Sequence, residues 1–162
     1  MKFTKIKYDG ERVILEWVTK KLNREEVEQR LTSAQRPSPA FIEAMQAFQP
    51  IVFDLLRLPL DYASGFRVTG LSINEEEGDG RAGLVITCRK TLPDCNSPLI
   101  LNTPHMREPV DDNDDGPGFY IEGVADALAL MCEQAEKFVG GERDQGDLFA
   151  SESVNEGQLA AT

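Results

Sequence analysis

The order of apolar and polar residues predicts a β-hairpin at the start of the chain. Apolar and polar positions alternate in residues 2–8 and again in residues 12–20, as expected for strands with one buried face. Asp9-Gly10 lies between the two runs. This dipeptide favours a two-residue type I′ turn, because both central residues of that turn need a positive φ angle. We therefore predict two antiparallel strands joined at Asp9-Gly10.

Residues 25–33 fit two kinds of structure. Val27 and Leu31 are four residues apart, which suits one face of a helix, while the other positions are polar and suit an exposed strand. We favour a polar third strand and keep the helix as the alternative.

The sequence around Arg36-Pro37-Ser38-Pro39 indicates the start of a helix. A serine at Ser38 can cap the helix, and Pro39 at the first helical position loses no hydrogen bond. Apolar residues then recur every three or four positions up to Leu56, as on a buried helical face. Pro50 interrupts this pattern and should kink the helix or split it in two, and Pro59 should end it.

A second group of strands and a second helix follow. Residues 104–118 contain three prolines and should be irregular. The last helix is expected over residues 119–139, with Gly140-Gly141 ending it. The predicted strands cover residues 66–73, 84–88 and 98–102.

This order of elements predicts an α+β fold. Strands, a helix, further strands and a final helix favour a mostly antiparallel sheet with two main helices packed on it. The 162 residues suit a single domain, which we place at residues 1–140. Residues 141–162 have little periodic apolar content and are predicted to form a flexible acidic tail.

Composition and charge narrow the range of functions. No run of apolar residues reaches the roughly 18 that a membrane span needs, and the first residues resemble no signal peptide. The three cysteines form no C-x-x-C pair, which fits a reducing compartment. We expect a cytoplasmic protein without a membrane partner. The net charge of −11 argues against a broad basic face that wraps duplex DNA.

The charge is unevenly distributed along the chain. Residues 1–36 carry nine Lys or Arg against six Asp or Glu, whereas the remainder is strongly acidic. In the predicted hairpin, basic residues are mixed with Trp17, a combination that can bind single-stranded DNA through phosphates and base stacking. Trp17 could equally belong to the core. The candidate nucleic-acid residues are Lys5, Lys7, Arg12 and Lys20.

The predicted tail contains Gln145-Gly146-Asp147-Leu148-Phe149. This segment resembles the peptide Gln-Leu-(Ser/Asp)-Leu-Phe, through which bacterial replication and repair proteins bind the DNA polymerase sliding clamp. The resemblance implies that Leu148 and Phe149 enter an apolar cleft and that the Gln145 amide sets the register. Asp147 matches as well and helps to keep the free tail soluble, while Gly146 replaces the usual leucine and should weaken binding.

The body of the chain resembles small, mostly uncharacterised proteins of bacteriophages and other mobile elements. The resemblance rests on residues 36–39, 49–52 and 97–104 and on the Gln-x-Asp-Leu-Phe ending. Together these resemblances imply a protein of the bacterial cytoplasm, including that of a phage-infected cell. They favour a non-enzymatic adaptor in DNA replication, recombination or repair that is tethered to the clamp. The alternative is a phage-encoded inhibitor or DNA-mimic decoy that acts on host replication or defence proteins.

Residues 111–122 match the residue pattern of an EF-hand calcium loop. Asp111, Asn113, Asp115 and Glu122 would supply oxygen ligands. Pro104 and Pro109 forbid the entering helix, however, and there is no second loop. An acidic loop in which Asp114 and Asp115 complement the dipole of the following helix explains the same residues, so no cofactor is expected and calcium is kept as the alternative.

Residues typical of catalysis are sparse. His105 lies among prolines with no assignable Ser or Cys nucleophile, and the cysteines are scattered too widely for a zinc site. Cys88 and Cys132 lie on a predicted strand and a predicted helix and are interpreted as core residues. The sequence therefore predicts a protein that is not an enzyme.

Overall fold

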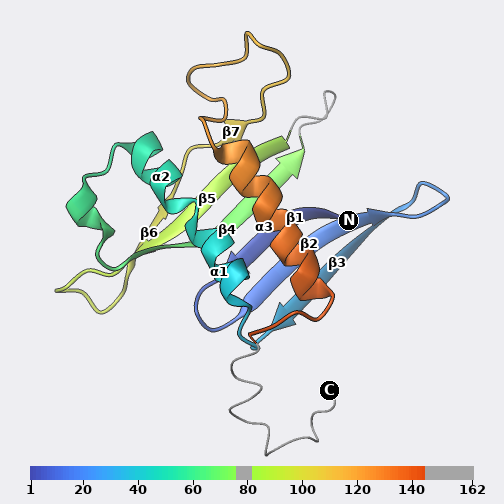
Figure 1. The fold of residues 1–162 in the computed structure, drawn as a ribbon, viewed down its shortest axis with the longest axis horizontal. Helices are drawn as coiled ribbons and strands as arrows, with labels where there is room; N and C mark the ends of the chain where they lie inside the picture. The colour runs from blue at the N-terminus through green and yellow to red at the C-terminus, as the bar shows by residue number, and fades with distance from the viewer. Residues whose placement is uncertain (76–81, 145–162) are drawn as a thin grey trace, which may run out of the picture.

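The structure is a computed structural model that describes residues 1–75 and 82–144. Its strands form one antiparallel sheet, and the helices lie on one face of that sheet (Figure 1). The spatial order is β3-β2-β1-β4-β5-β6, with β7 also paired to β5. The predicted α+β class is confirmed.

The elements are β1 (Lys2–Tyr8), β2 (Val13–Lys20), β3 (Glu26–Ser33), α1 (Pro39–Gln46), α2 (Gln49–Leu56), the 3-10 helix η1 (Leu60–Ala63), β4 (Phe66–Glu75), β5 (Ala82–Lys90), β6 (Leu99–Asn102), β7 (Met106–Arg107) and α3 (Val124–Val139).

The N-terminal hairpin is confirmed, but its turn is not the two-residue type I′ turn that was predicted. β1 ends at Tyr8 and β2 begins at Val13, so residues 9–12 form the loop. Gly10 has a φ angle of 98°, and Asp9 is not among the residues with positive φ. The Asp9 carboxylate instead accepts hydrogen bonds from the backbone N–H groups of Glu11 (2.9 Å) and Arg12 (3.0 Å). This Asx-type bonding stabilises a wider turn.

The ambiguous segment 25–33 is a strand, as favoured. β3 pairs with β2 in an unbroken antiparallel register from Val13↔Ser33 to Lys20↔Glu26. It is the edge of the sheet, so it needs few apolar side chains, and most of its residues are exposed.

The first helical segment is split in two, as Pro50 predicts. Ser38 caps α1 by accepting a hydrogen bond from the Phe41 N–H (3.2 Å). α2 ends at Leu56, before Pro59, because Arg57 adopts a left-handed conformation (φ 55°) and the Leu58 N–H closes onto the Phe53 carbonyl.

The last helix begins later than predicted. α3 starts at Val124 rather than at residue 119. Tyr120 donates its backbone N–H to the Arg107 carbonyl, so this part of the chain lies along β7 instead of coiling. Gly123, with a φ angle of 90°, then turns the chain into the helix. The irregular segment 104–118 accordingly contains one short strand, β7, whose Met106 is buried.

The core lies between the helices and one face of the sheet. On β2 and β5 alternate side chains are buried, whereas a register shift between Phe3 and Lys5 on β1 and a bulge near Thr69 on β4 each move the alternation by one residue. Phe41 of α1 packs against Phe138 of α3, with ring centroids 5.6 Å apart. The opposite face of the sheet is not covered by a helix (Figure 1). Within the described residues, no helix is long and apolar enough to cross a membrane.

Candidate functional site

The chain beyond α3 is fixed to the body at Arg143 and Asp144, four residues past the predicted end of the domain. Arg143 donates from Nε to the Gln35 side-chain oxygen (2.7 Å), and its guanidinium lies over the Phe138 ring, 3.5 Å from the centroid. Such a stacked, partly buried guanidinium contributes on the order of 1 kcal/mol. Burial lowers the pKa of Arg143, but an arginine stays charged at neutral pH.

Asp144 completes this C-terminal anchor, which consists of Arg143 and Asp144 with Gln35 and Arg36. Its backbone N–H donates to the Arg36 carbonyl (3.1 Å), and its carboxylate lies 3.1 Å from Arg36 Nε. The Asp144 side chain is only 19% exposed, so this ion pair is better shielded than most surface pairs. The anchor joins the end of the helical layer to the chain that follows β3.

The predicted clamp-binding residues follow the anchor without a spacer. Gln145, Asp147, Leu148 and Phe149 lie outside the described residues, so their prediction rests on the sequence. The anchor nevertheless defines their point of attachment, since Gln145 is the residue after Asp144.

The candidate nucleic-acid residues do not form one cluster. Lys5 and Lys7 flank the buried Ile6 on β1, so both project from the uncovered face of the sheet. Arg12 lies in the loop before β2, and Lys20 is the last residue of β2, so the length of this strand separates them. The structure therefore brings Lys5 and Lys7 together on one face and places Arg12 and Lys20 at opposite ends of β2.

Lys5 and Lys7 border a shallow groove on this uncovered face. The groove has a volume of about 210 Å³, and there is room for it because Gly70 of β4 has no side chain and Ser72 has a small one. Lys7 lies opposite Gly70, and Lys5 lies opposite Ser72. A groove of this size, with two ammonium groups beside it, can accept a phosphate group.

Two further basic residues, missed in the sequence, extend this surface. Arg67 of β4 and Arg89 of β5 are directly opposite each other in the sheet. Their neighbours Phe66, Val68 and Cys88 point into the core, so both arginines project from the uncovered face. Like charges at directly opposed positions destabilise a sheet unless an anion compensates them. We call Lys5, Lys7, Arg67 and Arg89 the basic face, and none of them is in an ion pair formed within residues 1–75 and 82–144.

Trp17 cannot provide a stacking surface on the basic face. It is 6% exposed and packs in the core against Phe3, with ring centroids 5.9 Å apart. Its indole N–H donates to the Gln29 side-chain oxygen (3.0 Å). The interpretation of Trp17 as a core residue is confirmed, and the mixture of charge and aromatic stacking suggested by the sequence is absent from the hairpin.

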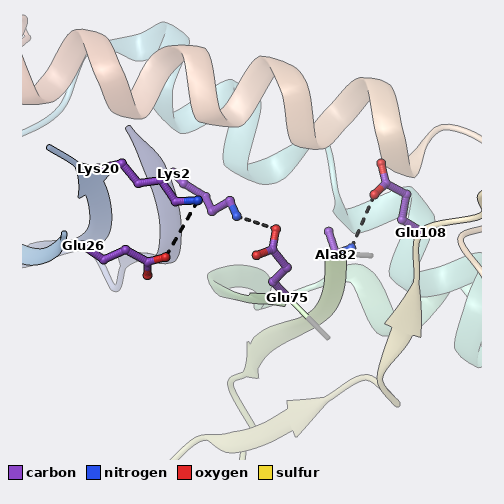
Figure 2. Close-up of polar contacts among 6 residues, drawn as sticks. All are labelled: Lys2, Lys20, Glu26, Glu75, Ala82 and Glu108. Atoms are coloured by element: carbon purple, nitrogen blue, oxygen red, sulfur yellow. Dashed lines mark hydrogen bonds and ion pairs between the residues drawn. The ribbon is translucent and has the colours of Figure 1, made fainter. Parts of the chain in front are cut away.

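Lys20 belongs to a different, mixed-charge site at one end of the sheet. β1 and β4 pair only over Lys5–Lys7 and Gly70–Ser72, and beyond this register they leave an open cavity of about 500 Å³. Lys2 forms an ion pair with Glu75 at this end, and Lys20 lies 4.0 Å from Glu26 (Figure 2). Because each lysine has a carboxylate partner, this cavity has little net charge to attract an anion.

The carboxylates of the acidic loop bond to the backbone of the loop itself. The Asp111 carboxylate accepts the Asn113 N–H (2.7 Å), and Asp114 accepts the N–H groups of Val110 (3.0 Å) and Asp111 (3.3 Å). Within the described ranges, no group of three or more His, Cys, Asp or Glu side chains is placed to hold a metal ion.

The helix expected to leave this loop is also displaced. Glu122 precedes α3 instead of lying within it, and the acidic residue in the first turn of α3 is Asp126. The interpretation of Asp114 and Asp115 as residues that complement the helix dipole is therefore wrong. The calcium site at Asp111, Asn113, Asp115 and Glu122 stays a prediction from the sequence.

His105 packs against the sheet, and the thiols of Cys88 and Cys132 are buried or half-buried. His105 Nε2 lies 3.1 Å from the Asn74 side-chain oxygen, and the ring covers Gly83 of β5. Burial raises the pKa of Cys88 to about 12 and that of Cys132 to about 11. These two thiols stay protonated at neutral pH, and a protonated thiol is a poor nucleophile.

Comparison with known proteins gave no relative for this fold or these sites. No protein-family model matches the chain, and neither the curated proteins nor the solved structures contain a match. The function of this chain is therefore inferred from its C-terminal anchor, the sequence of its tail and its basic face.

Proposed function

We propose that this protein is a non-enzymatic adaptor that binds the bacterial sliding clamp through Gln145, Asp147, Leu148 and Phe149. The proposal rests on the sequence of this motif, which directly follows Asp144, the last residue of the C-terminal anchor. A peptide attached at a fixed point on a folded body recruits that body to its partner, and a second weak contact then suffices for function.

The second contact that we propose is single-stranded DNA on the basic face. Lys5, Lys7, Arg67 and Arg89 project from one uncovered surface of a chain whose net charge is −11. Without an exposed aromatic residue there, binding would depend on phosphate contacts, so it would be weak and strongly dependent on salt. Such weak binding suits a protein that is already held at the clamp.

Clamp binding is tested with the full-length protein and purified clamp. The double variant Leu148→Ala/Phe149→Ala should bind at least about 30-fold more weakly, because it removes both apolar anchors of the peptide. Leu159→Ala, which changes an apolar tail residue outside the motif, is the matched control and should bind like the wild type. Gly146→Leu restores the usual leucine and should tighten binding about tenfold. Equal affinities for all four proteins would refute the proposal.

DNA binding is tested by retention of a labelled oligonucleotide at low and high salt. Lys5→Gln/Lys7→Gln should lower the affinity and reduce the salt dependence by roughly 0.7 per lost phosphate contact. Lys137→Gln removes a charge from α3, where Lys137 is paired with Glu133 at 3.6 Å, and should leave retention unchanged. Retention that does not respond to salt would remove DNA from the proposed function.

An adaptor differs from an inhibitor in its effect on clamp-dependent DNA synthesis. An adaptor leaves synthesis largely unchanged at stoichiometric amounts of protein, whereas an inhibitor that occupies the clamp cleft blocks it. Inhibition by the wild type but not by the Leu148→Ala/Phe149→Ala variant would replace the adaptor with the phage-encoded inhibitor.

A further inference from the structure

One long edge of the sheet carries unpaired backbone groups. β3 extends over Glu26–Ser33 without a bulge, and β2 is the only element in the described part of the chain that packs extensively against it. The opposite edge is β6, which is only four residues long and follows Pro98. Proteins commonly protect edges by such shortness or by proline, and β3 has neither device.

The turn between β2 and β3 shows which residues of β3 direct their backbone outward. The Arg24 N–H bonds to the Lys21 carbonyl (2.9 Å) and the Lys21 N–H to the Glu25 carbonyl (2.8 Å), so Lys21 and Glu25 form a hydrogen-bonded pair. Hydrogen-bonded and non-bonded pairs alternate along an antiparallel ladder. The backbone groups that point away from β2 consequently belong to the even-numbered residues Glu26, Glu28, Arg30 and Thr32.

The side chains of these four residues lie on the uncovered face of the sheet. Trp17 of β2 is buried against the helices and is directly opposite Gln29, so the odd-numbered residues of β3 share the helix-covered side. Arg30 lies 3.5 Å from Glu16 of β2 and is 60% exposed, whereas Glu28 is opposite the uncharged Val18. Glu28 therefore carries an exposed negative charge next to Arg30 along the free edge.

We propose that β3 pairs with β3 of a second copy of this chain, antiparallel and centred on Gln29, to form one continuous sheet across a dimer. In this register Glu28 faces Arg30 of the second copy twice, Glu26 faces Thr32, and about eight backbone hydrogen bonds form. Each Arg30 then lies between its own Glu16 and the Glu28 of the other copy. On the covered side, the half-buried Val27 meets Leu31 of the second copy.

Other registers of the same edge are less favourable. A pairing centred on Arg30 places two arginines directly opposite each other, and one centred on Glu28 forms two Glu26–Arg30 pairs but places two glutamates opposite each other at its centre, which destabilises a sheet. Only the pairing centred on Gln29 forms two opposite-charge pairs without opposing like charges. In a parallel, in-register pairing each charged residue lies beside the same residue of the second copy, so like charges repel at Glu26, Glu28 and Arg30. If the register shifts by one residue, each even-numbered residue of one copy faces an odd-numbered residue of the other. The backbone N–H and C=O groups of the odd-numbered residues already bond to β2, so they cannot pair across the interface. The order of charges along β3 thus selects a closed, two-fold symmetric pair.

Two charge reversals test the interface with the full-length protein. By sedimentation equilibrium, the wild type should have twice the 18.0 kDa mass of one chain. Glu28→Arg and Arg30→Glu should each weaken self-association by about tenfold or more, because each places like charges opposite each other twice. Mixing the two variants restores both opposite-charge pairs, so the mixture should form a heterodimer. Glu43→Arg makes the same charge reversal at an exposed position of α1, away from β3, and should leave the mass of the dimer unchanged.

A cysteine substitution tests the register. In a Cys95→Ser background, which removes the exposed native thiol, Gln29→Cys should form a disulfide-linked dimer under mild oxidation. Residues opposed in a non-hydrogen-bonded antiparallel pair lie close enough for a disulfide. Thr32→Cys, which would face Glu26, should not cross-link. A monomeric wild type, a dimer unaffected by both charge reversals, or equal cross-linking of the two cysteine variants would overturn the proposal.

Discussion

The two hydrogen bonds between Gln46 and Val68 offer the sharpest test of how the helices are joined to the sheet. Gln46, the last residue of α1, donates from its side-chain Nε2 to the Val68 carbonyl (2.8 Å) and accepts from the Val68 N–H (3.0 Å). β1 pairs with β4 only at Gly70, Leu71 and Ser72, so Val68 lies beyond the end of that ladder. The Gln46 amide takes the place of the missing strand.

The variant Gln46→Met keeps the length and helix propensity of this side chain but removes both hydrogen bonds. Val68 is completely buried, so its N–H and C=O lose their partners without gaining water. An unsatisfied buried group costs about 1–3 kcal/mol, and two such groups, partly relieved by local relaxation, should cost about 2–4 kcal/mol. For a domain of this size, that loss lowers Tm by about 4–16 °C.

Urea unfolding followed by circular dichroism measures this loss. The control is Glu43→Met, which places the same residue at an exposed position of α1 and should change the free energy of unfolding by less than about 0.5 kcal/mol. If Gln46→Met costs no more than Glu43→Met, then the Val68 backbone has another partner and the reasoning is wrong.

Three further predictions concern Gly83, the reactivity of the cysteines and the dependence of stability on pH. Gly83→Ala should destabilise the fold by about 1–3 kcal/mol, because a Cβ at Gly83 meets the His105 ring and the Asn74 side-chain oxygen, and urea unfolding should show part of this cost disappearing in a His105→Ala background. A thiol reagent at pH 8 should modify the exposed Cys95 rapidly, the half-buried Cys132 more slowly and the buried Cys88 only on unfolding, and modification of Cys88 in the native protein would contradict its burial. Burial raises the pKa of Cys88 from 9.0 to about 12, so the unfolded state releases a proton that the folded state retains. Stability should therefore fall as the pH rises from about 9 towards 12, and a Cys88→Ala variant should lose part of this dependence.

The elements with strong local signals could be predicted from the sequence. Ser38 and Pro39 define the start of α1 through a cap and a fixed φ angle, and Pro50 splits the helices because it lacks an N–H group. The start of α3 could not be predicted, because Tyr120 is held by Arg107 of β7, which its local sequence does not reveal. The Gln46 bridge was missed for a similar reason, since a polar residue on a helix usually faces water.

The basic face, too, could be predicted from the sequence only in part, because two of its residues are brought together by strand pairing. Lys5 and Lys7 are two residues apart on one strand, so their shared side follows from the alternation of the sequence. Arg67 and Arg89 are far apart in the sequence, and only the register of β4 and β5 places them opposite each other. Arg12 and Lys20 were grouped with them by charge alone, and the length of β2 separates that pair.

The proposed adaptor function requires that the full-length protein binds the sliding clamp. Isothermal titration calorimetry of purified clamp with the wild type and with Leu148→Ala/Phe149→Ala measures this interaction. We predict saturable binding by the wild type, tighter binding by Gly146→Leu, and a loss of at least about 30-fold in the double variant. An absence of binding by the wild type, or equal binding by the wild type and the double variant, would contradict the proposed recruitment to the clamp.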